Sequence, residues 1–199
     1  DGSGTAERLT QPEQGTSHVP ESWSRDGKRL LFCVSKDSRF SLSVLSLQDK
    51  QTSPYGGVTT AGPISAQFSP DGLWVAYHGG DGLFVQPFPA TGAKYELANG
   101  IHPFWSPDAR ELFARPRGRL LATAITTRPT FTFANPTEIP NAGRLLDRGP
   151  GFERNQDIMP DGTRFVGVIS ADQAQSTTTN APSIQVVEHW FEELKARVK

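Results

Sequence analysis

The 199-residue sequence contains one cysteine, no long run of basic residues and no apolar run long enough to span a membrane. A single cysteine excludes an internal disulfide, and a transmembrane helix would need roughly 18 or more consecutive apolar residues. The formal charge of −1, without a basic patch, disfavours nucleic acids and anionic membranes as partners. Cys33 lies in an apolar run, 30–34, and is predicted to be a buried structural thiol.

Motifs that carry common catalytic chemistry are also absent. The sequence has no G-x-S-x-G, H-E-x-x-H, EF-hand or P-loop motif,, and it lacks the glycine-rich and H-R-D loops of protein kinases,. His189 and Glu192 have a spacing that could hold a metal, but a solvated helix face explains them better without further ligands. We therefore predict no enzyme activity, no catalytic residue, no metal and no cofactor.

Glycine and proline, in contrast, are abundant, with 19 and 16 residues. This content excludes a helical bundle and favours many short elements joined by tight turns. The hydrophobic fraction of 36% is too high for a disordered chain. Because the chain opens with Asp1-Gly2-Ser3-Gly4, without an initiator methionine or a signal peptide, we expect a piece of a longer protein.

One phrase recurs four times along the chain. Its turn aspartates lie 45, 37 and 53 residues apart, and a period of about 45 residues is typical of propeller blades. An aromatic residue ends one strand, the proline and aspartate shape a turn, and a short apolar strand follows. The four copies are Trp23–Gly27, Phe68–Gly72, Trp105–Ala109 and Ile158–Gly162. We assign Asp26, Asp71, Asp108 and Asp161 to the turns rather than to calcium binding or catalysis.

The phrase W/F-S-P-D-G, followed by R-x-L-x-F/Y, resembles the repeat of TolB-like, WD-repeat-like β-propellers. The resemblance covers about 180 residues and implies an all-β fold with four-stranded antiparallel blades. Three copies depart from the pattern: Arg25 replaces the turn proline of the first, Ala109 replaces the turn glycine of the third, and the fourth has lost its aromatic residue and its serine. If position 109 needs a positive φ, alanine costs about 1 kcal/mol there.

The repeat divides the chain into four blades within a single domain or half-propeller, 1–199. The ranges are 1–16 for an outer strand of a preceding or ring-closing blade, then 17–61, 62–99, 100–149 and 150–187 for blades one to four. Four blades look like half of an eight-bladed ring, because relatives of this repeat have six to eight. We expect a homodimer, or the parent protein, to complete the ring, with a compact four-bladed ring as the alternative.

The C-terminal segment is predicted to be a short helix over 188–198. Apolar residues form one stripe there, and acidic residues precede basic ones, as the helix dipole favours. The ending Val186–Lys195 resembles a "VV-x-x-WFEELK" tail found in the C-terminal propellers of bacterial serine/threonine protein kinases. The helix either caps an exposed propeller face or docks a partner.

The candidate binding residues lie near the starts of the expected innermost strands. In propellers, loops at the channel mouth commonly meet ligands and partner peptides. The matching positions in this sequence are Glu21, Ser65, His102 and Arg154. Their mixed charge suits a peptide or a small polar ligand, and water-filled channel lining is the plainer interpretation.

The resemblance implies a non-catalytic binding, sensor or scaffold module of a larger bacterial signalling protein such as a kinase. The alternative is the propeller part of a peptidase or lactonase. A third interpretation is a role in assembly alone. The sequence leaves the compartment open, with a periplasmic or extracytoplasmic location favoured over a cytoplasmic one.

Overall fold

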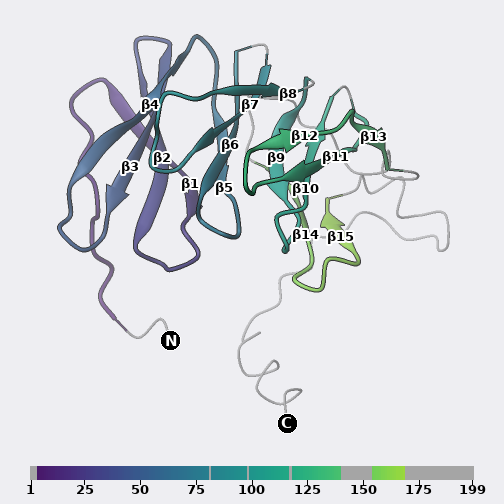
Figure 1. Cartoon of the computed structure of the whole chain (residues 1–199). Coiled ribbons are helices and arrows are strands. Elements are labelled where there is room, and N and C mark those ends of the chain that lie inside the picture. The colour runs from purple at the N-terminus through teal and green to yellow at the C-terminus, as the bar shows by residue number, and fades with distance from the viewer. Residues whose placement is uncertain (1–3, 81, 98, 117, 140–153, 169–199) are drawn as a thin grey trace, which may run out of the picture. The chain divides into compact units, whose positions relative to one another are not determined.

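The computed structural model describes residues 4–80, 82–97, 99–116, 118–139 and 154–168. The chain forms two units, Asp1–Val168 and Ile169–Lys199, and all described residues belong to the first. The described residues form fifteen strands and no helix (Figure 1). The fold is therefore all-β, as the repeat predicts.

Two complete four-stranded antiparallel sheets come first along the chain. The first has the order β1-β2-β3-β4, with β1 (Thr16–Trp23), β2 (Arg29–Lys36), β3 (Arg39–Ser46) and β4 (Thr52–Thr60). The second has the order β5-β6-β7-β8, with β5 (Ser65–Phe68), β6 (Trp74–Gly79), β7 (Gly82–Pro87) and β8 (Tyr95–Leu97). Consecutive strands pair in each sheet, which is the arrangement of a propeller blade.

The third sheet differs from the expected four strands, because its outermost strand is split. Its members are β9 (Ile101–Trp105), β10 (Glu111–Arg115), β11 (Leu121–Thr126), β12 (Thr132–Phe133) and β13 (Thr137–Glu138). Both β12 and β13 pair with β11. Pro136 lies between them and lacks the N–H that a continuous ladder needs,.

The fourth sheet is described over two strands, β14 (Gln156–Ile158) and β15 (Phe165–Gly167). The third strand expected at 183–187 and the helix expected at 188–198 lie outside the described residues. The strand expected within 1–16 pairs with no described strand. Instead, Leu9 packs against Leu30, Phe32 and Leu45 of the first sheet.

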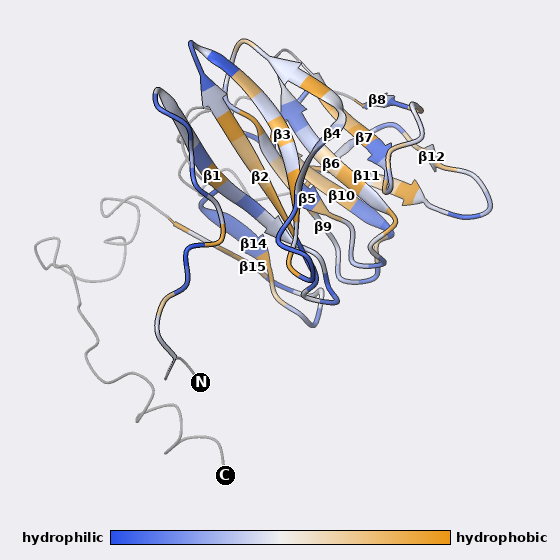
Figure 2. Ribbon diagram, turned by 90° about the vertical axis from the view of Figure 1, so that its left-hand side faces the viewer, coloured by the Kyte–Doolittle hydropathy of each residue, from blue (hydrophilic) through white to orange (hydrophobic). Residues whose placement is uncertain are grey.

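The middle strands of the first three sheets bury side chains on both faces, because their apolar runs send alternate side chains to opposite sides,. On β2, Leu31 and Cys33 pack toward the second sheet, whereas Leu30 and Phe32 pack on the opposite face. On β10, Leu112 packs toward the second sheet. Figure 2 shows hydrophobic residues (orange) concentrated in the strands. Burial raises the pKa of the Cys33 thiol to about 11, so the thiol is protonated at neutral pH.

Candidate functional site

The turn aspartates hold the hairpins together, as the repeat predicts. In the first copy, the Ser24 hydroxyl donates to Oδ1 of Asp26 at 2.6 Å, and the backbone N–H of Lys28 donates to the same oxygen at 3.0 Å. Ser24 also accepts from the N–H of Arg29 at 2.9 Å. The same pattern recurs in the second and third copies, around Asp71 and Asp108. These carboxylates therefore serve the backbone of their own turns.

The hydrogen bonds also set the charge state of the turns. The Ser24 hydroxyl, followed by the N–H of Lys28, lowers the pKa of Asp26 below its usual 3.8. The Ser106 hydroxyl and the N–H of Arg110 lower the pKa of Asp108 in the same way. In the fourth copy Met159 replaces the serine, and the N–H of Thr163 is the main cause of the lowered pKa of Asp161. All three carboxylates are ionised at neutral pH.

The first strands of successive sheets lie side by side (Figure 1). Strand β1 contacts β5, β5 contacts β9, and β9 contacts β14. The four candidate residues lie on or just before these strands. The structure therefore places all of them along one row of neighbouring strands, which we call the inner row.

Glu21 is the extra residue of a β-bulge in β1, where the pairing with β2 shifts between Pro20 and Ser22. A bulge bends the strand and redirects the side chain. The carboxylate crosses to the second sheet, where its Oε2 accepts from the backbone N–H of Ala66 at 3.1 Å. Ser22 makes a similar crossing and accepts from the N–H of Phe68 at 3.2 Å.

Ser65 and His102 meet directly. Ser65 Oγ lies 3.4 Å from Nδ1 of His102, a distance at the long end of hydrogen bonding. His102 also lies at a bulge, between the β9–β10 pairs of Phe104 and Ile101. Its φ of +52° is uncommon for a side chain other than glycine,, and only 4% of it is exposed. The imidazole is therefore held firmly between the second and third sheets.

Arg154 reaches back from the fourth sheet to the third. Its Nη1 donates to the carbonyl of Pro103 at 3.2 Å, and its Nη2 lies 3.6 Å from Oδ2 of Asp157. Arg154 thus contacts the backbone beside His102, just as Glu21 contacts the backbone beside Ser65. The four residues form a chain of contacts from sheet to sheet rather than one shared pocket.

The candidate residues are not strict equivalents in the repeat. Counted back from the turn aspartate, Ser65 and His102 stand six residues away, Glu21 stands five and Arg154 seven. Glu21 is itself the extra residue of the bulge in β1. Chemically, the inner row offers a carboxylate, a hydroxyl, an imidazole and a guanidinium, which together can bind peptide or other polar groups of either charge.

Arg115 is a buried cation that the sequence analysis missed. It is 2% exposed, and it donates from Nη1 to Oε1 of Gln156 at 3.0 Å and from Nη2 to the carbonyl of Gly118 at 2.8 Å. The contact links the third and fourth sheets. Little in the sequence indicates that Arg115 is buried, because a charged residue at the end of an apolar strand is ordinarily exposed to solvent.

The described residues hold neither a cluster of metal-ligand type nor a membrane-spanning helix. No group of three or more histidine, cysteine, aspartate or glutamate side chains is arranged there to hold a metal ion. The same part of the chain contains no helix with the length and apolar character needed to cross a membrane.

Comparisons with known proteins identify the architecture. No protein-family model and no curated protein matches the chain. Among solved structures it is similar to TolB from Acinetobacter baumannii, with 20% identity, a TM-score of 0.55, and coverage of 85% of this chain and 47% of that one. A TolB-type protein from Agrobacterium tumefaciens is 16% identical, with a TM-score of 0.55 and coverage of 80% of this chain and 61% of that one.

A third similar structure is the β-propeller domain of Cps50 (Swd1) from Myceliophteria thermophila. It shows 16% identity and a TM-score of 0.50, over 74% of this chain and 47% of that domain. The likeness shows the fold, a β-propeller with four-stranded antiparallel blades. The chain spans about half to three-fifths of the length of these three structures.

Proposed function

We propose that this chain is a non-catalytic propeller segment that binds a peptide or a small polar ligand along its inner row. The parent would be a larger bacterial signalling protein, such as a serine/threonine kinase whose catalytic domain lies elsewhere. The kinase association rests on the resemblance of Val186–Lys195 to the tail of such proteins.

The observation that carries the binding proposal is the series of contacts along the inner row. Glu21 and Arg154 each engage the backbone of a neighbouring sheet, at 3.1 and 3.2 Å. Along the inner row, a carboxylate thus accepts from a backbone N–H and a guanidinium donates to a backbone carbonyl. An extended peptide presents the same groups and suits the same side chains.

A peptide selection tests this proposal. Random displayed peptides are selected on the 199-residue chain, and the affinity of the best is measured by titration calorimetry. We expect Arg154→Ala and Glu21→Gln each to weaken binding roughly tenfold, as for residues that anchor an interface. Arg39→Ala, an exposed arginine on β3, is the matched control and should bind as the unaltered chain does.

Two results would contradict the proposal. One is that no peptide is selected by the folded chain. The other is that Arg154→Ala and Glu21→Gln bind the selected peptides as tightly as Arg39→Ala does.

The contact between Ser65 and His102 favours one alternative, a hydrolase with a serine nucleophile. A hydroxyl within hydrogen-bond reach of an imidazole is the core of such sites. Ser65 lies within the regular pairing of β5 with β6, however, and not on the sharp turn that exposes a nucleophile. A fluorophosphonate probe separates the two: a hydrolase is labelled at Ser65 and loses the label in Ser65→Ala, whereas a binding module stays unlabelled.

We also propose that a second copy of the chain completes the ring. Exposed apolar side chains on the two terminal sheets support this idea. Trp23 of the first sheet is 52% exposed, and Val166 of the fourth is 52% exposed. A second copy that covers these two sheets would remove both side chains from water.

A further inference from the structure

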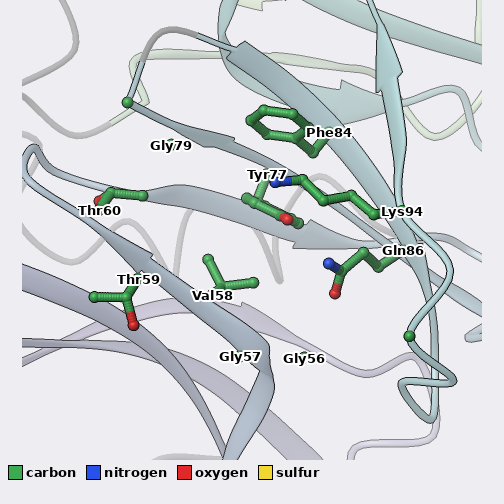
Figure 3. A pocket seen from close by; sticks show the side chains of 12 residues that line it. Gly56, Gly57, Val58, Thr59, Thr60, Tyr77, Gly79, Phe84, Gln86 and Lys94 are labelled. Carbon is green, nitrogen blue, oxygen red and sulfur yellow. The ribbon is translucent and has the colours of Figure 1, made fainter.

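A second candidate site lies between the first two sheets, apart from the inner row. It is a cavity of about 440 Å³, within the size range of small-molecule sites. None of its lining residues belongs to β1, β5, β9 or β14. The lining residues are Gly56, Gly57, Val58, Thr59, Thr60, Tyr77, Gly79, Gly80, Phe84, Gln86, Gly92 and Lys94 (Figure 3).

The wall of this cavity is shaped by a large bulge in β4. Ser41 pairs with Thr59, but Ser43 pairs with Pro54, so the residues between Pro54 and Thr59 leave the ladder. Tyr55 fixes the bulge to the second sheet, because its hydroxyl donates to the carbonyls of Gln86 and Pro87 at 3.2 and 2.9 Å. Bulges of this kind often adjoin binding sites.

Glycine is required at the tip of the bulge. Gly56 and Gly57 have φ values of +56° and +66°, which glycine adopts at little cost. A Cβ on Gly56 would overlap Oε1 of Gln86, whereas a Cβ on Gly57 would meet open space. The bare backbone therefore comes close to Gln86 and leaves the cavity open beside Gly57.

Lys94 gives the cavity a positive charge. Of the lining residues, it alone is formally charged, and among the described residues it has no carboxylate within ion-pair distance. Its Nζ lies 3.7 Å from the centre of the Phe84 ring, and Figure 3 shows the side chain reaching toward Phe84 and Tyr77. The ring holds the ammonium by a cation–π contact while leaving it free to meet an anion.

The uncharged groups of the lining narrow the class of ligand. Thr59 supplies a hydroxyl, and Gln86 supplies an amide that is 5% exposed. Thr60 supplies a hydroxyl oxygen that can accept, while its proton goes to the carbonyl of Gly62. Hydroxyls and amides can each donate and accept, so they match ligand hydroxyl groups. We propose that this cavity binds a small hydroxylated carboxylate, with the carboxylate on Lys94 and the hydroxyls on the threonine and glutamine side chains.

Gluconate and sorbitol are matched probes, because they share a polyol chain and gluconate adds the carboxylate. We expect titration calorimetry on the 199-residue chain to detect gluconate and to give at least roughly tenfold weaker binding for sorbitol. Binding of gluconate should weaken as salt concentration rises, since the lysine is exposed to solvent,. Sorbitol binding as tightly as gluconate, or no gluconate binding, would overturn the proposal.

Two pairs of variants locate the site. Lys94→Met should weaken gluconate binding at least roughly tenfold, whereas Lys36→Met, at an exposed lysine outside the cavity, should leave it unchanged. Thr59→Glu should abolish binding, because the added carboxylate repels that of gluconate. Thr59→Gln should retain binding, because glutamine has the shape of glutamate without its charge. Thr59 and Lys94 are both exposed, so these variants should keep the thermal midpoint of the unaltered chain. Equal affinities within either pair would show that gluconate binds elsewhere.

Discussion

The serine and aspartate of the recurring turn act as a unit. In three of the four copies, the serine hydroxyl donates to the carboxylate and accepts a backbone N–H five residues on. These bonds hold the two ends of each turn together and give its backbone N–H groups acceptors. The phrase therefore recurs because it closes hairpins, and no catalytic role is needed to explain its aspartates.

Ala109 occupies the turn position that glycine holds in the other three copies. Its φ is +60°, close to the +67°, +71° and +72° of Gly27, Gly72 and Gly162. We expect Ala109→Gly to raise the free energy of unfolding by about 1 kcal/mol, because it removes the strain of a Cβ in this region. Chemical denaturation measures the change.

A strand alanine provides the control for this substitution. Ala124→Gly, at an exposed position of β11, should lower the free energy of unfolding by about 0.5–1 kcal/mol. Equal effects of the two substitutions would show that position 109 carries no strain.

The turn aspartates predict a loss of stability in acid. The pKa values of Asp26, Asp108 and Asp161 are below 3.8 in the folded chain. A lowered pKa means that the carboxylate stabilises the fold fully above the unfolded value and loses this effect as pH falls through the folded value. The contribution of these carboxylates to the free energy of unfolding should therefore be level above about pH 5 and decline below about pH 4.

Removal of one serine tests the cause of that acid dependence. In Ser106→Ala, the pKa of Asp108 should rise toward its usual value, because the hydroxyl hydrogen bond that lowers it most is lost. The decline of stability below about pH 4 should then be shallower than in the unaltered chain. If stability falls with pH as it does in the unaltered chain, the serine hydroxyl is not the cause of the acid dependence.

At the scale of strands and sheets, close packing on both faces dictates which residues fit. Three apolar clusters separate the four sheets in sequence order. The third cluster includes the rings of Phe104 and Phe113, whose centres are 5.2 Å apart. In such interiors, one added methyl group measurably lowers the free energy of unfolding.

Gly100 marks one of these close approaches. A Cβ there would lie 2.6 Å from the Cβ of Ala114 on β10, and neither residue has space to move because both are buried. We expect Gly100→Ala to lower the free energy of unfolding by about 1–3 kcal/mol. The measurement is urea denaturation of the single variants and the double variant.

The double variant identifies the contact. Ala114→Gly removes the methyl group that Gly100→Ala would strike, so the two changes together should cost less than the sum of the single effects. Simple additivity of the two free-energy changes would place the clash elsewhere.

The repeat predicted the strands and turns well, because their residues act locally. Turn glycines, turn aspartates and apolar runs each determine the structure within a few residues. The bulges at Glu21 and His102 and the split of β12 from β13 were not predicted, since they depend on contacts between strands. The cavity beside Lys94 was also missed, because its residues come together only through the bulge in β4.

For the candidate residues, the sequence predicted their place in the fold but not their contacts. Counting from the repeat identified the inner row but not the contacts within it. Only the structure shows that Ser65 meets His102, while Glu21 and Arg154 meet neighbouring backbone. Arg115 gave no local signal of burial, because its partner Gln156 is 41 residues away.

At the scale of the whole molecule, ring completion predicts self-association. If a second copy covers the apolar faces of the terminal sheets, light scattering should give twice the chain mass of 21.7 kDa. The second copy buries the exposed apolar side chains that the first sheet and the fourth sheet present. A mass near 21.7 kDa at all concentrations would favour the compact four-bladed ring, or completion by the parent protein.

Binding along the inner row is the central claim about the molecule, and amide hydrogen exchange with a selected peptide tests it most directly. Exchange is compared for the 199-residue chain with and without the peptide. If the peptide binds along the inner row, added protection should concentrate in β1, β5, β9 and β14. Protection confined to the outer strands β4, β8, β12 and β13, or no change in exchange at saturating peptide, would contradict it.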